Sequence, residues 1–78
     1  MNVRESKHVE RYVRSRGILQ QYRKAKQRLL SDNFQAVGFR KRQPKTLNIW
    51  YFRITQKYRG HCVWKGDTII IFDVDDHQ

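Results

Sequence analysis

The sequence is short of three things: cysteine, proline and acidic residues. Cysteine and proline each occur once among 78 residues, so no disulfide can form within the chain. A zinc site is not expected, because one cysteine and three scattered histidines lack ligand spacing; these are Cys62, His8, His61 and His77. No apolar run could span a bilayer, and none follows Met1 as in a signal peptide. We therefore expect one soluble, cytoplasmic domain over residues 1–78, with Cys62 in its core and no metal or cofactor.

The few acidic residues are also unevenly placed. There are 7 against 17 Lys and Arg, a formal net charge of +10, and four of the seven lie in residues 67–78. Residues 34–65 contain no acid at all. Self-repulsion on this scale is typical of proteins that bind an anionic partner. Nucleic acid is the interpretation we favour; an acidic protein partner or a merely solubilising surface remains the alternative.

The hydrophobic pattern changes from helical to alternating about half-way along the chain. Residues 1–4 are a candidate strand. Ser6 is a candidate N-cap for a first helix, and Gly17 suits its C-terminal end. A second helix follows, in which apolar residues recur at helical spacing up to Ser31. The first stripe consists of Val9, Tyr12 and Val13, and the second of Ile18, Tyr22, Ala25 and Leu29.

After a basic connection over residues 34–47, three runs rich in aromatic and β-branched residues predict strands at 48–54, 58–64 and 68–74. Their short connectors favour an antiparallel meander. The predicted fold class is therefore α+β, with two N-terminal helices packed on one face of a small antiparallel sheet, in the order β-α-α-β-β-β.

Side-chain parity predicts the two faces of this sheet. The uncharged faces must meet the helices, because burying an unpaired charge costs several kcal/mol. In the second and third of these runs the core-facing sets are then Tyr58, Gly60, Cys62 and Trp64, and Ile70, Phe72 and Val74. The turn length places Phe52 over Gly60 and Arg53 opposite Arg59, with Asp73 beside Arg59 on its other side.

The expected pairing of Arg53 with Arg59 places two positive charges directly opposite each other. Directly opposed like charges destabilise a strand pair. Asp73 could relieve the repulsion in a surface ion-pair cluster, and a bound phosphate could do so through bidentate guanidinium contacts. Both interpretations remain open from the residues alone.

Two segments resemble a known family. Residues 49–59 read IWYFRITQKYR, and residues 71–77 read IFDVDDH. An aromatic strand ending in Arg-Ile, a short turn and then Tyr-Arg is similar to the RelE/ParE toxin superfamily. The second segment resembles the last strand and terminal histidine of RelE- and YoeB-like toxins. The resemblance implies a type II toxin that enters the ribosomal A site and cleaves mRNA without metal, through attack of the 2′-hydroxyl. It also implies a cognate antitoxin protein as partner.

The resemblance implies roles for individual residues. Arg59 would contact the scissile phosphate, Arg53 would support it, and His77 would act as general acid or base. The remaining candidate RNA-binding residues are Arg40, Lys41, Arg42, Lys45, Lys57, His61 and Tyr51.

The chain also departs from these relatives. It lacks their glutamate base, and Gln78 stands where many have a tyrosine. The proton acceptor is then His77, His61, Asp75 or a lysine. Stacking on an mRNA base either falls to Tyr51 or is missing from this chain. The alternatives are a ParE-like gyrase poison of the same fold and a non-catalytic RNA-binding module.

Overall fold

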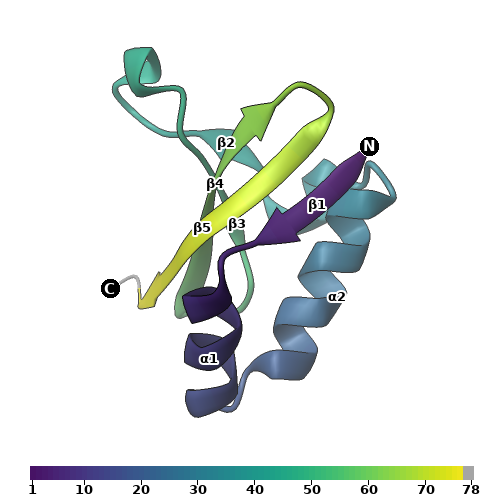
Figure 1. The fold of residues 1–78 in the computed structure, drawn as a ribbon, viewed down its shortest axis with the longest axis vertical. Coiled ribbons are helices and arrows are strands. Elements are labelled where there is room, and N and C mark those ends of the chain that lie inside the picture. Colours follow the sequence, from purple (N-terminus) through teal and green to yellow (C-terminus); the bar gives the residue numbers. More distant parts are fainter. Residues whose placement is uncertain (77–78) are drawn as a thin grey trace.

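The computed structural model describes residues 1–76 and has one sheet and two helices (Figure 1). The strands are β1 (Asn2–Glu5), β2 (Arg40–Lys41), β3 (Trp50–Arg53), β4 (Tyr58–Lys65) and β5 (Thr68–Asp76), in the spatial order β1-β5-β4-β3-β2. The helices are α1 (Lys7–Ser15) and α2 (Leu19–Leu30), with short 3₁₀ turns η1 (Phe34–Val37) and η2 (Lys45–Leu47). The α+β class is as predicted, and the element order is the predicted one with one further strand, β2. No described helix is long and apolar enough to cross a membrane.

The sheet is mixed rather than wholly antiparallel. β1 runs parallel to β5, with Val3 beside Ile69, and the other neighbours are antiparallel. Two helices separate β1 from the rest of the sheet in the sequence, and this connection is long enough to carry the chain into a parallel arrangement. Figure 1 shows α1 and α2 side by side on one side of the sheet, below β1 and β5.

The predicted helical stripes are the buried ones. α1 buries Val9 and Val13, and Ser6 precedes it in an extended conformation without a side-chain capping bond. Gly17 follows at φ +71°, a left-handed conformation that favours glycine at a helix end. α2 buries Tyr22, Ala25 and Leu29.

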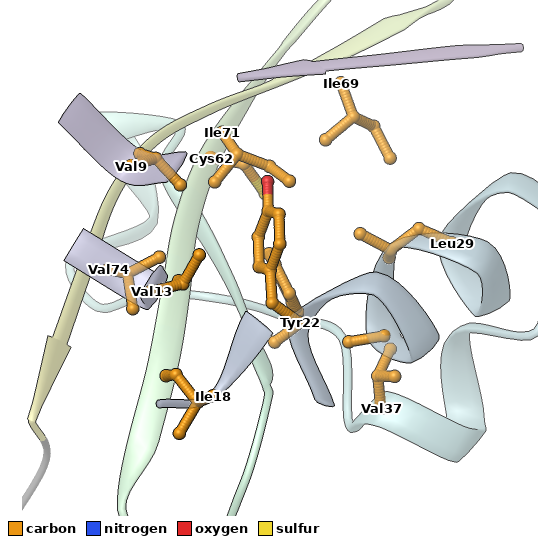
Figure 2. Close-up of a cluster of buried hydrophobic side chains, with 12 residues drawn as sticks. Val9, Val13, Ile18, Tyr22, Leu29, Val37, Cys62, Ile69, Ile71 and Val74 are labelled. Atoms are coloured by element: carbon orange, nitrogen blue, oxygen red, sulfur yellow. The ribbon is translucent and has the colours of Figure 1, made fainter. Parts of the chain in front are cut away.

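The core lies between these helices and the sheet (Figure 2). Figure 2 shows side chains from both layers converging, among them Tyr22 and Leu29 from α2 and Cys62 and Ile71 from the sheet. Cys62 is fully buried, as predicted, and burial raises the pKa of its thiol to about 12. Phe52 is fully buried, and Trp50 and Trp64 pack against the core, so all three aromatic side chains are structural.

A partly buried polar contact ties β1 to α2. The Tyr22 hydroxyl donates a hydrogen bond to the Glu5 carboxylate, and Lys26 Nζ lies 3.0 Å from the same oxygen. Burial raises the pKa of Glu5, but the bonds from Tyr22 and Lys26 outweigh burial, and the net pKa is lowered. Burial and the bond to Glu5 together raise the pKa of Tyr22.

The lowered pKa of Glu5 predicts a pH-dependent contribution to stability. A depressed carboxyl pKa stabilises the folded state above the unfolded pKa, and this stabilisation is lost as pH falls through the folded value. Glu5→Gln is expected to lower the free energy of unfolding by about 1 kcal/mol at pH 7 and by much less at pH 3. Urea denaturation at the two pH values measures the difference. Glu10→Gln is the matched control, because its pair with Arg14 is exposed and is worth at most about 0.5 kcal/mol. Equal losses in both variants at pH 7 would contradict the prediction.

The β3–β4 register is the predicted one. Phe52 lies opposite Gly60, and Arg53 opposite Arg59. The turn between the strands is fixed by the Thr55 hydroxyl, which accepts the backbone N–H groups of Lys57 and Tyr58 at 3.1 Å each.

The β4–β5 register was predicted wrongly. His61 lies opposite Asp73 and Cys62 opposite Ile71, so Phe72 is an extra residue in a β-bulge. Arg59 therefore faces Asp75 and not Asp73. The bulge also exchanges the faces of the first half of β5. Ile69 and Ile71 are fully buried and Val74 is nearly so, whereas Ile70 and Phe72, which were expected in the core, are partly exposed.

The basic connection contains structure that the sequence did not predict. β2 pairs Arg40 with Tyr51 and Lys41 with Trp50. η1 buries Val37, and the neighbouring rings of Phe34 and Phe39 stack at 5.0 Å. η2 lies at the tip of the segment between β2 and β3, on the side away from the helices (Figure 1).

Candidate functional site

Charged and aromatic side chains form two rows across the face of the sheet that the helices do not cover. Directly opposed residues of antiparallel strands point to the same face. The first row is Arg40, Tyr51 and His61, and the second is Arg53, Arg59 and Asp75. Both rows cross neighbouring strands, so residues far apart in the sequence become neighbours on this open face.

Three arginines surround one hollow on the open face. The hollow has a volume of about 130 Å³, and Gly38 and Tyr51 complete its lining beside Arg40, Arg53 and Arg59. Gly38 contributes no side chain, which leaves room beside Arg40. We call this group of five residues the arginine hollow.

The cations of the arginine hollow have no acidic partner in the described structure. Within residues 1–76, no carboxylate lies within 4.0 Å of the guanidinium groups of Arg40, Arg53 or Arg59. Asp73, the expected partner of Arg59, lies 3.7 Å from His8 instead. The ion-pair cluster predicted as one alternative is therefore not formed here, and three guanidinium groups can supply hydrogen-bond donors to one anion.

Tyr51 holds Arg59 in place. The Arg59 guanidinium carbon lies 4.9 Å from the centroid of the Tyr51 ring, a cation–π contact. This contact orients Arg59 without neutralising its charge, so the guanidinium remains available to an anionic ligand.

A second hollow adjoins the first and shares Tyr51 and Arg59 with it. It measures about 250 Å³, and its other lining residues are Arg42, Gln43, His61 and Asp75. Within it, His61 Nε2 lies 2.9 Å from Asp75 Oδ1. His61 is only 9% exposed, so it is not an ordinary exposed strand residue. Its Nδ1 is buried and has no hydrogen-bond partner within residues 1–76.

The structure gathers some of the predicted site residues and separates others. Arg40, Arg42, Tyr51, Arg53, Arg59 and His61 all line the two hollows. Lys41 lies over the Trp50 ring at 5.8 Å, and Lys57 lies 3.6 Å from Asp76. Lys45 belongs to the exposed turn η2. His77 lies outside the described residues.

Sequence reasoning missed Gly38 and Gln43, and it considered Asp75 only as a proton acceptor. Gly38 and Gln43 come from the connection that carries β2, whose course no local pattern indicated. Asp75 reaches His61 because this end of β5 is shifted by two positions from the predicted register, one from the bulge and one from a turn in which Lys65 already pairs with Thr68. No group of three or more His, Cys, Asp or Glu side chains within residues 1–76 is arranged to hold a metal ion.

No protein-family model and no curated protein matches this chain. Its function is therefore inferred from the open face of the sheet and from the residues that carry the resemblance.

Proposed function

We propose that this protein is a RelE-like toxin, a metal-independent endoribonuclease that cleaves mRNA on the ribosome. The single observation that carries the proposal is the arginine hollow: three guanidinium groups on one open face, with no carboxylate of residues 1–76 within 4.0 Å of any of them. Residues 49–59 and 71–77, which resemble the toxin family, contribute Tyr51, Arg53, Arg59 and Asp75 to the same face.

The proposed reaction is intramolecular transesterification. The ribose 2′-oxygen bonds to the adjacent phosphorus as its proton is taken up, and the bond to the 5′-oxygen breaks as that oxygen gains a proton. The crowded phosphorane between these steps carries extra negative charge. Fixed donors that face this charge lower the barrier, and arginine suits the purpose because its planar fork binds two phosphate oxygens.

Arg59 is the central residue in this proposal, with Arg53 and Arg40 on either side of the same anion. His61 and Asp75 are hydrogen-bonded to each other next to the hollow and can hold or pass a proton. His77 is the other proposed acid or base. Arg42 lines the second hollow and suits a neighbouring phosphate.

The proposed setting follows from the same charge distribution. A toxin of this kind would act in the cytoplasm, where ribosomes and mRNA are found, and an antitoxin with an acidic segment would neutralise the open face. The net charge of +10 matches both an RNA substrate and such a protein partner.

The test maps mRNA 5′ ends in a purified translation system, with and without ribosomes. New ends within codons at the A site are expected with the unaltered protein. Arg59→Ala is expected to lower the cleavage rate by about 10²–10³-fold, as loss of one fixed donor to a developing anion does. Arg59→Lys keeps the positive charge but loses the planar guanidinium. Its cleavage rate should lie between those of the unaltered protein and Arg59→Ala. Arg28→Ala, an exposed cation on α2, is the matched control and should cleave normally.

A second function is supported by one feature of the site. His61 Nε2 is already engaged by Asp75, so this nitrogen is not free to exchange a proton directly with a bound RNA. A non-catalytic RNA-binding module would bind RNA through the arginine hollow and leave all messages intact. Absence of cleavage by folded protein in every condition would therefore refute the nuclease, and inhibition of DNA gyrase would then point to the ParE branch.

A further inference from the structure

The β5 bulge places an aromatic ring on the open face. Phe72 is the unpaired residue of the bulge, between Ile71, which faces Cys62 in the core, and Asp73, which faces His61. Phe72 is partly exposed and is absent from the side chains that pack against the core. Its ring centroid lies 6.5 Å from that of His61, which lines the second hollow.

Phe72 is better suited to stacking than Tyr51. Arg59 already lies over the Tyr51 ring, so Tyr51 serves to orient that guanidinium. No cation–π contact to the Phe72 ring occurs within residues 1–76. The ring lies beside His61, which stands two residues after Arg59 on β4, and two residues along a strand span about 7 Å. An extended nucleotide can bridge such a gap between a bound phosphate and a stacked base.

The charges around Phe72 indicate what binds there. Asp73 and Asp75 follow Phe72 along β5, and their side chains are 50% and 55% exposed. These carboxylates repel a phosphate, whereas a nucleobase is uncharged and its exocyclic amino groups can donate to them. A phosphate is therefore favoured on the β2–β3 side of Arg59, in the arginine hollow, and a base on the β5 side, beside Phe72.

We propose that Phe72 is the stacking platform for an unpaired nucleobase whose adjoining phosphate occupies the arginine hollow. The proposal rests on the proposed RNA substrate and adds to it the residue that holds the base. Stacking of this kind is sequence-tolerant and is typical of proteins that bind single-stranded RNA.

The experiment uses a short single-stranded RNA with 2′-O-methyl groups throughout, so that no 2′-hydroxyl can attack, and with a single 2-aminopurine. Stacking quenches the fluorescence of this base. The unaltered protein is expected to quench it on binding. Phe72→Leu, which keeps an apolar side chain in the bulge, is expected to abolish the quench and to weaken affinity about tenfold. Phe72→Trp should restore both. Ile70→Ala, a partly exposed neighbour on the same face, is the control and should leave the quench unchanged.

The outcomes separate this inference from the proposed function. Arg59→Gln should weaken affinity but retain the quench at saturating protein, because the base still reaches Phe72. An unchanged quench and affinity in Phe72→Leu, with Arg59→Gln still defective, would overturn the stacking role and leave the RNA substrate standing. No binding of this RNA by the unaltered protein would overturn both. Binding of an acidic peptide, lost in Phe72→Leu while RNA binding persists, would assign the ring to a protein partner instead.

Discussion

Phe52→Ala is expected to lower the free energy of unfolding by about 3–5 kcal/mol, the usual cost of removing a fully buried aromatic side chain. The ring lies at the centre of the core and covers Gly60 on the neighbouring strand. A domain of this size has a total stability of roughly 4–12 kcal/mol, so the loss amounts to about a quarter of the total or more. Chemical denaturation followed by circular dichroism measures the loss. Leu47→Ala, at an exposed apolar position, should change stability by less than about 0.5 kcal/mol.

The contact with Gly60 makes this prediction sharper. A methyl group at Gly60 would lie 2.3 Å from Phe52 Cζ, so Gly60→Ala should itself cost about 1–3 kcal/mol through overpacking. In a Phe52→Leu background the added methyl has space, and the cost of Gly60→Ala should shrink. Additive effects of the two substitutions, or a loss below 1 kcal/mol in Phe52→Ala, would show that the ring does not pack on Gly60 as described.

The second large effect concerns RNA affinity. The four arginines of the two hollows are changed together to glutamine. The ratio of the unaltered protein's affinity for single-stranded RNA to that of this variant is expected to be about 600-fold larger at 0.1 M salt than at 1 M salt. Each phosphate contact contributes roughly 0.7 to the slope of log affinity against log salt, so the slope should fall by about 2.8. The four residues are Arg40, Arg42, Arg53 and Arg59. Fluorescence anisotropy at several salt concentrations measures both quantities.

A matched control variant separates the effect of the two hollows on RNA affinity from the effect of net charge. Four exposed cations on the helices, changed together to glutamine, remove the same charge from the opposite side of the molecule; they are Arg11, Arg23, Lys24 and Arg28. This variant should lose far less affinity and keep most of the salt slope. An equal loss in both variants would mean that RNA is attracted by overall charge and that the arginine hollow has no special role.

Local patterns were enough to predict most of the fold. The helical stripes, the order of elements and the β3–β4 register all depend on residues close in sequence, and the short turn at Thr55 leaves one register available. The parallel β1–β5 pairing depends on segments more than sixty residues apart, which no local pattern specifies. β2 has two residues, too few for alternation to be visible.

The candidate site shows the same difference between features set by residues close in sequence and features set by distant segments. Arg53 and Arg59 were paired correctly because one short turn joins them. Arg40 joins them only through β2, and the roles of Asp75 and Phe72 depend on the bulge. Parity assumes unbroken alternation, so a single extra residue in β5 reversed the predicted faces of Ile69, Ile70, Ile71 and Phe72. Nothing in that stretch is a glycine or proline that would have marked the irregularity.

The position of β5 between β1 and β4 has a consequence for how the protein is made. β5 joins the first strand to the meander and brings Ile69 and Ile71 into the core, so neither half of the sheet is complete without it. Closing a chain segment of this length is slow compared with forming helices. During synthesis the helices and β3–β4 can emerge and partly order, but the core closes only after residues 68–76 have left the ribosomal exit tunnel. The nascent chain therefore gains its assembled open face only once β5 has been made and has left the tunnel.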